Sequence, residues 1–304
     1  MPFTSKQLEL YFSRIDYQGS TQVSEETLNN IHTAQIFSIP FENLELQEIK
    51  NASKADTIIH LDEKSLFNKL VINRRGGYCH ENNELLATVL STLGFTVDRL
   101  AARVLIEPNL SITHKLLLVT IGDKRWIADV GFGANGIYKP MLLVPDQIIK
   151  QYGDSFRLTR EKDKYTLEIS QAENWVKLYE FSTNPVKAID FEPMSYYVSH
   201  HPDSIFVKNR ICVLPTPEGR ITLNNDQLKI KQGKRKTQIS LKDGSAYLEA
   251  LETYFGLKFP KETQFKAFAT QSTDAWCSLF RKATVGIGLL SALLIAKQVQ
   301  QRWR

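Results

Sequence analysis

The amino-acid sequence predicts an α+β protein with a helical N-terminal part, a barrel-like antiparallel sheet and a C-terminal part that combines strands with a helix. Apolar residues recur at helical spacing over the first third of the chain, and short alternating runs follow. Further short strands then precede one more helix. We therefore expect subdomains at 1–93, 94–195 and 196–275, and an apolar and basic tail at 276–304.

The N-terminal part contains clear signals for the start of three helices. Thr4 opens a capping box, Ser24 precedes two glutamates, and Asp62 precedes a third apolar helical face. Pro40 interrupts the helical pattern after the second of these helices, because proline lacks the backbone N–H that a helix needs. We expect a loop around Pro40.

The middle of the chain carries runs of β-branched and aromatic residues that are separated by turn residues. Their short length and alternating character predict antiparallel strands, as in a small barrel. The expected strands are 97–104, 115–121, 125–130, 155–160, 165–169 and 175–181.

The C-terminal part combines short strands with one helix. We expect a loop at 193–204 that crosses an active site, followed by strands that include 206–208, 211–214 and 220–223. Ser245 is the expected cap of a helix that ends at Gly256, a residue suited to the left-handed conformation after a helix.

The composition is that of an ordinary soluble globular protein. The net charge of +5 is diffuse and does not indicate nucleic-acid binding, although it suits anionic ligands such as a coenzyme's phosphates. The cysteines, Cys79, Cys212 and Cys277, are few and far apart, which favours a reducing compartment over a disulfide framework. Since there is no metal-ligand spacing and no signal peptide, we expect a metal-free cytoplasmic protein.

Cys79 stands at the start of a strong helical pattern. A pair of arginines and two glycines precede it, and apolar residues then recur at helical spacing as far as Gly94. The N-terminal end of a helix carries partial positive charge, which favours a thiolate. Gly76 and Gly77 allow a sharp turn and leave room beside the sulfur. Cys79 is therefore a candidate nucleophile, and a buried structural cysteine is the alternative.

A nucleophilic cysteine needs a base, and His114 is the best placed of the six histidines. It begins a strand that a glycine-containing turn joins to the strand before Asp129. If Gly122 and Asp123 form a two-residue turn, His114 lies diagonal to Asp129 on one face of the hairpin. The two residues can then act as a base and its orienting group. A three-residue loop would give a different register.

His80 is the immediate neighbour of Cys79 but a poor candidate for this base. Adjacent residues on a helix point in different directions. We expect His80 at the surface or in a capping role.

Several motifs together resemble those of the arylamine N-acetyltransferase family. The resemblance extends from about the N-terminus to residue 260, and the motifs occur in the family's order. Besides His114 at the start of a strand, they read Ile-Pro-Phe-Glu-Asn-Leu at 39–44, Arg-Gly-Gly-Tyr-Cys at 75–79, Asp-Val-Gly-Phe-Gly at 129–133, Asp-Phe-Glu at 190–192 and His-Pro-Asp-Ser-Ile-Phe at 201–206.

This resemblance implies a fold with a catalytic core like that of cysteine proteases and transglutaminases, and with a C-terminal α/β lid. It implies a ping-pong reaction in which Cys79, His114 and Asp129 transfer an acetyl group from acetyl-CoA, through an acetyl-cysteine, to an arylamine or arylhydrazine. Acetyl-CoA is then a cosubstrate and no cofactor is bound permanently.

The resemblance also suggests roles for residues around this triad. Phe132 and Phe37 are expected to line the acceptor pocket, and Gly131 and Gly133 to lie close to the coenzyme. For either phenylalanine, ordinary core packing is the alternative.

A buried ion pair between Glu42 and Arg75 would hold the Pro40 loop against the cysteine turn, and the resemblance supports such a pair. On residue type alone, both could instead be solvated surface charges.

Two other functions are compatible with the same residues. A cysteine hydrolase or amidase uses the same Cys-His-Asp chemistry but admits water as the acyl acceptor. A membrane-recruited scaffold without activity is suggested by the tail alone. Residues 283–296 are apolar throughout and have basic flanks, but they are too few to span a bilayer. They fit either contact with a membrane surface or docking within the chain or an oligomer.

Overall fold

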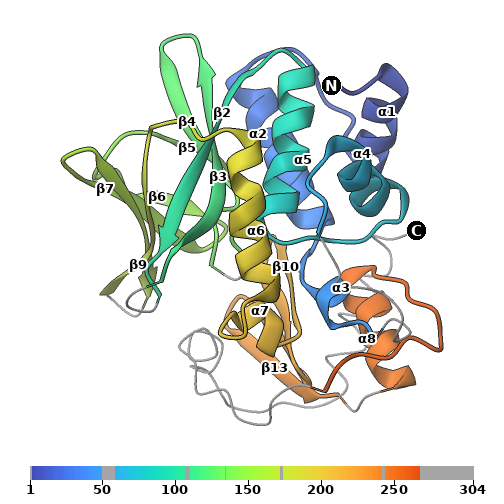
Figure 1. Ribbon diagram of the computed structural model, residues 1–304. Helices are drawn as coiled ribbons and strands as arrows, with labels where there is room; N and C mark the ends of the chain where they lie inside the picture. Colours follow the sequence, from blue (N-terminus) through green and yellow to red (C-terminus); the bar gives the residue numbers. More distant parts are fainter. Residues whose placement is uncertain are drawn as a thin grey trace.

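The computed structural model describes residues 2–49, 59–106, 110–133, 135–171, 174–241 and 244–267. In this part of the chain, helices pack against two antiparallel sheets of eight and five strands (Figure 1). The predicted α+β class is therefore confirmed. The apolar run at 283–296 lies outside the described residues. Within them, no helix is long and apolar enough to cross a membrane.

The helices of the N-terminal part begin where the sequence predicts. Side chains of Thr4, Ser24 and Asp62 accept hydrogen bonds from the first turn of their helices, so these three caps are confirmed. The helices are α1 (Ser5–Arg14), α2 (Glu25–Ser38), α3 (Leu44–Gln47), α4 (Glu63–Leu66), the π-helix η1 (Phe67–Ile72) and α5 (Cys79–Thr92). The change of the third predicted helix into a π-helix after Leu66 was not predicted.

The eight-stranded sheet follows α5 directly and contains the six predicted strands of the middle part. Its strand order is β5-β4-β3-β2-β9-β8-β7-β6, with every neighbouring pair antiparallel. The strands are β2 (Thr96–Val104), β3 (Ile112–Ile121), β4 (Lys124–Ala128), β5 (Met141–Leu142), β6 (Ile149–Gln151), β7 (Asp154–Glu161), β8 (Lys164–Gln171) and β9 (Asn174–Ser182).

The five-stranded sheet combines one strand from the N-terminal part of the chain with four strands from the C-terminal part. Its order is β1-β10-β11-β12-β13, with helix α8 (Ser245–Phe255) packed against it. The strands are β1 (Phe41–Glu42), β10 (Ile211–Thr216), β11 (Gly219–Asn224), β12 (Gln227–Gln232) and β13 (Arg235–Ser240). The segment after Pro40, which we expected to be only a loop, thus supplies an edge strand to this sheet.

Three predictions in the C-terminal part are wrong. The expected loop at 193–204 is mostly helix α6 (Phe191–His200), and the expected strand at 206–208 lies in helix α7 (Ile205–Lys208). Pro193 occupies the first turn of α6, where a missing backbone N–H costs nothing. The boundary expected between residues 195 and 196 consequently falls inside α6. Gly244 rather than Ser245 caps α8, whereas its end at Gly256 in a left-handed conformation is confirmed.

In the view of Figure 1, helix α5 has α6 on one side and α1 and α4 on the other. Its side chains from Cys79 to Leu90 are all buried. Glu84 joins it to the large sheet, because this carboxylate contacts Arg99 of β2 at 2.5 Å and the fully buried Lys115 of β3 at 2.9 Å. The start of α5 is thereby fixed beside strand β3.

Candidate active site

Cys79 is the first residue of α5, as predicted. Tyr78 is the N-cap residue, and the cysteine side chain is buried. Its Sγ lies 3.8 Å from the carbonyl oxygen of Thr113 on β3. The sulfur therefore lies at the positive end of a buried helix, next to the residue that precedes His114.

His114 and Asp129 meet through the predicted hairpin register. Ile121 pairs with Lys124, so Gly122 and Asp123 form the two-residue turn. The His114 Nε2 atom lies 2.8 Å from Oδ2 of Asp129. Both side chains are buried, with the carboxylate fully so. The structure thus brings the predicted base and its orienting group into direct contact.

Asp129 is held by groups from three separate elements. Asn83 of α5 donates its side-chain N–H to Oδ1 of Asp129 at 2.9 Å, and the backbone N–H of Gly131 donates to the same oxygen at 2.9 Å. The backbone N–H of Asp129 donates to Nε2 of His32, in helix α2, at 3.1 Å. A buried carboxylate with this many partners has a fixed orientation.

The electrostatics of the pair favour the charged forms of both groups. Burial alone would lower the pKa of His114, but the Asp129 carboxylate and hydrogen bonding to Asp129 and Cys79 raise it to about 10. Burial would raise the pKa of Asp129, but His114, Asn83 and the Gly131 amide together hold it below its usual value. At neutral pH the imidazole is therefore an imidazolium beside the cysteine sulfur.

The two phenylalanines that we predicted to line a pocket occupy different places. The ring of Phe132 lies 5.1 Å from that of His114 and 5.0 Å from that of Tyr179. Phe37 contacts the rings of Tyr138 and Tyr152 instead, at 6.2 and 5.2 Å. Phe132 is therefore next to the pair of His114 and Asp129. Phe37, near the end of α2, packs in an aromatic group with Tyr138 and Tyr152. Their role in binding an acceptor stays a prediction.

Gly131 and Gly133 each have a steric reason to be glycine. A Cβ atom on Gly131 would lie only 2.7 Å from Cα of Cys79 and 2.8 Å from Nδ2 of Asn83. Gly133 has a φ of +89° and packs against the ring of Phe41. These contacts bring the 129–133 segment directly over the start of α5, and contact of either glycine with a coenzyme stays a prediction.

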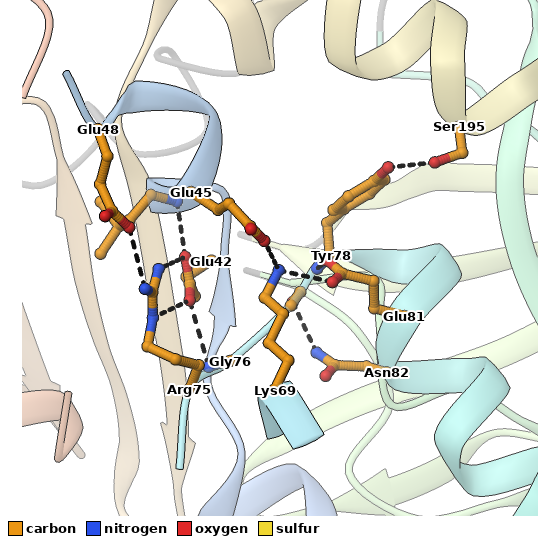
Figure 2. Close-up of polar contacts among 12 residues, drawn as sticks. Glu42, Glu45, Glu48, Lys69, Arg75, Gly76, Tyr78, Glu81, Asn82 and Ser195 are labelled. Carbon is orange, nitrogen blue, oxygen red and sulfur yellow. Dashed lines mark hydrogen bonds and ion pairs between the residues drawn. The ribbon is translucent and has the colours of Figure 1, made fainter. Parts of the chain in front are cut away.

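Glu42 and Arg75 form a buried ion pair under the cysteine turn (Figure 2). The Arg75 Nε atom lies 3.0 Å from Oε1 of Glu42, which is fully buried, and Nη1 lies 3.0 Å from Oε1 of Glu48. The same Glu42 oxygen accepts the backbone N–H of Gly76 at 3.2 Å. The pair thus joins strand β1 to the turn that leads into Cys79.

Asn83 and Lys69, which lie near the site, were not identified from the sequence, and His80 was misplaced. Asn83 stands four residues after Cys79, on the same face of α5, so helical spacing was the signal that identifies it. Lys69 forms an ion pair with Glu81 that no local pattern indicates. The surface or capping role expected for His80 is wrong, because His80 is fully buried against the rings of Tyr78 and Phe191. Helix α6 supplies Phe191 and therefore covers this face of α5.

No group of three or more histidine, cysteine, aspartate or glutamate side chains in the described ranges is placed to hold a metal ion.

Replacing Arg75 by methionine should lower the free energy of unfolding by about 3–5 kcal/mol, because Glu42 is left as a buried charge without its cation. Adding Glu42→Gln should recover part of this loss, since the amide carries no charge and its oxygen still accepts one of the two backbone N–H groups that bind Glu42. Chemical denaturation measures both changes. The exposed neighbour Arg74 is the matched control, and Arg74→Met should change little. An Arg75→Met protein as stable as Arg74→Met would contradict the role of the pair.

The stability that His114 contributes should depend on pH. Its pKa is about 10 in the folded protein and about 6.5 in an unfolded chain, so its contribution is complete below about pH 6.5 and is lost as the pH rises through 10. The difference in unfolding free energy between the wild type and His114→Gln should therefore shrink from pH 6.5 to 10. A difference that stays constant over this range would show that the histidine is not charged in the folded state.

Comparisons with known proteins agree with this geometry. Residues 25–264 match the model of a family described as N-acetyltransferase. An arylamine N-acetyltransferase from Mycolicibacterium smegmatis is 36% identical over 254 residues, which cover 81% of this chain and 90% of that protein. The Escherichia coli (strain K12) arylamine N-acetyltransferase is 33% identical over 82% of this chain and 88% of its own length.

Solved structures give the same result. The Salmonella typhimurium arylamine N-acetyltransferase superposes with a TM-score of 0.78 at 30% identity, covering 85% of this chain and 96% of that one. The Mycobacterium marinum enzyme in complex with CoA has a TM-score of 0.76 at 32% identity, covering 82% of this chain and 92% of that one. This chain therefore belongs to the arylamine N-acetyltransferase family of acyltransferases.

Proposed function

We propose that this protein acetylates arylamines and arylhydrazines with acetyl-CoA, by a ping-pong mechanism through an acetyl group on Cys79. The observation that carries the proposal is the 2.8 Å contact between His114 and the buried Asp129, beside a cysteine at the start of a buried helix. A cysteine, a histidine and an orienting carboxylate in this arrangement form the machinery of acyl transfer.

In the first half-reaction, the Cys79 thiolate attacks the carbonyl carbon of the acetyl thioester. The imidazolium of His114 favours the thiolate before attack. Backbone N–H groups at the start of α5 are the nearest donors for the negative oxygen of the tetrahedral intermediate. The bond to the coenzyme sulfur then breaks, the departing thiolate takes a proton from His114, and the acetyl group stays on Cys79.

In the second half-reaction, the amine nitrogen attacks the acetyl carbon of Cys79. Neutral His114 accepts the proton that the nitrogen loses, and the cysteine thiolate is released as the amide forms. Asp129 keeps the imidazole in one orientation during both transfers, because its own position is fixed by Asn83 and Gly131.

Placement of the substrates follows from the neighbours of the triad. Phe132 contacts the imidazole ring and is the group best placed to meet an aromatic acceptor, and Phe37, which packs with Tyr138 and Tyr152, is the second residue that we expect to line the pocket. Gly131 packs against Cα of Cys79 and Gly133 against the ring of Phe41, and we place the pantetheine arm on this side of the nucleophile. Contact of the tail at 283–296 with a membrane surface remains a prediction.

A cytoplasmic location fits this chemistry. Both cysteines in the described part of the chain, Cys79 and Cys212, are free thiols. A thiol nucleophile needs a reducing compartment to stay active.

The mass of the intact protein after brief exposure to acetyl-CoA tests the proposal. We expect a gain of one acetyl group that is absent in Cys79→Ala and is removed when an arylamine such as an aminosalicylate is added. The amine should be recovered as its amide. No adduct on a Cys79 that still reacts with iodoacetamide would contradict the use of acetyl-CoA. Rapid loss of the adduct to water alone would instead indicate a hydrolase.

A further inference from the structure

Lys69 lies between two carboxylates beneath the start of α5 (Figure 2). Its Nζ atom is 2.6 Å from Oε1 of Glu81 and 2.7 Å from Oε2 of Glu45. The Glu81 side chain is only 1% exposed, and that of Lys69 is 17% exposed. In the described residues, Lys69 is the basic side chain within ion-pair distance of Glu81. The three residues come from η1, α5 and α3.

Glu81 connects this cluster to the backbone next to Cys79. Its second oxygen, Oε2, accepts the N–H of Tyr78 at 3.1 Å, while its own N–H donates to the Tyr78 carbonyl at 3.1 Å. A Cβ atom on Gly77 would lie 2.8 Å from Cβ of Glu81, so the turn packs directly on this side chain. Movement of the Glu81 carboxylate would therefore move the peptide that precedes Cys79.

The π-helix η1 positions Lys69 for this contact. Its wider turn is seen in the hydrogen bond from Asn73 N–H to the Asn68 carbonyl at 2.8 Å, and the Arg75 N–H donates to the Lys69 carbonyl at 3.0 Å. π-Helical turns are rare in proteins, and many of those that occur lie at functional sites. Lys69 is thus held at both its side chain and its backbone against the turn that leads to Cys79.

Lys69 also determines the charge state of Glu81. Burial raises the pKa of Glu81 to about 7 although Lys69 acts in the opposite direction, and the nearby carboxylates of Glu45 and Glu42 raise it further. Tyr78, the N-cap residue of α5, is another titratable group beside this cluster, and burial together with the Glu81 and Glu45 carboxylates holds its pKa well above the usual value. Without Lys69, the pKa of Glu81 would rise further, so a larger share of Glu81 would be neutral at pH 7, and a neutral Glu81 is a weaker acceptor for the Tyr78 N–H.

We propose that Lys69 is a positioning residue for the nucleophile: through Glu81 it fixes the Tyr78 peptide and hence the orientation of Cys79 toward His114. This inference rests on the proposed function, in which Cys79 becomes acetylated. Lys69 acts here through Glu81 and does not touch the substrate.

The test is the single-turnover rate of Cys79 acetylation by acetyl-CoA between pH 6 and 9. Lys69→Met should lower this rate at pH 7 by between about ten- and a hundred-fold, because a nucleophile displaced by about 1 Å reacts that much more slowly. The loss should decrease as the pH rises and Glu81 ionises again. Lys69→Arg, which can still contact both carboxylates, should retain most of the rate.

A second substitution separates positioning from packing. Lys69→Met combined with Glu81→Gln should recover most of the rate at pH 7 and remove the pH dependence that Lys69→Met adds, since the amide oxygen accepts the Tyr78 N–H and does not titrate. The exposed Lys64 in α4 gives the matched control, and Lys64→Met should behave as wild type. A Lys69→Met protein with the wild-type rate and profile, or a double variant as slow as the single one, would overturn the proposal.

Amide hydrogen exchange across residues 76–82 tests the positioning without any acetyl transfer. The Tyr78 N–H should exchange faster in Lys69→Met than in the wild type at pH 7, and should be protected again in the double variant. If the wild type is not acetylated at all, the proposed function fails, while exchange still decides whether Lys69 fixes the turn. Unchanged protection in Lys69→Met would refute the positioning role.

Discussion

The candidate site depends on the burial of the Asp129 carboxylate. A buried carboxylate is strongly unfavourable unless charge and hydrogen bonds compensate for the lost water. Here the compensation comes from a strand, a helix and the loop that follows: His114, Asn83 and the Gly131 amide each contact one carboxylate. Because the hydrogen bonds to Asp129 come from β3, α5 and the 129–133 segment, these three parts lie together. His114 therefore lies beside Cys79.

The other side of the nucleophile is fixed by a second set of buried charges. Arg75 pairs with Glu42 and Glu48, and Lys69 pairs with Glu81 and Glu45, so the turn between η1 and α5 is held from both sides (Figure 2). The ring of Phe259, in the segment after α8, lies 4.3 Å from the Arg75 guanidinium and helps to exclude water. The C-terminal sheet and its helix thus contribute to the cysteine turn through β1 and Phe259.

The parts of the fold and the site that could be predicted are those that nearby residues in the sequence determine. The two-residue turn at Gly122 and Asp123 set the register of the hairpin, and the register placed His114 diagonal to Asp129. Glycines before Cys79 and helical spacing after it gave the start of α5. Each of these inferences uses residues that are close together in the chain.

The features that could not be predicted depend on distant partners. Strand β1 consists of two residues and is a strand only because β10, far along the chain, pairs with it. The contact of Lys69 with Glu81 requires a π-helix, which has no distinct local pattern. A loop was expected at 193–204, but Pro193 stands in the first turn of α6, where it breaks no hydrogen bond. For β1, tertiary pairing determined the local structure.

The central claim is that the fold places a charged His114, oriented by the buried Asp129, beside Cys79, and we propose that Cys79 reacts there as a thiolate. The most direct test is the rate at which iodoacetamide alkylates Cys79 in the wild-type protein as a function of pH. If the thiolate–imidazolium pair is present, the rate should stay nearly constant between about pH 6 and pH 8. A rate that rises about tenfold for each pH unit in this range, as it does for an isolated cysteine, would contradict the account.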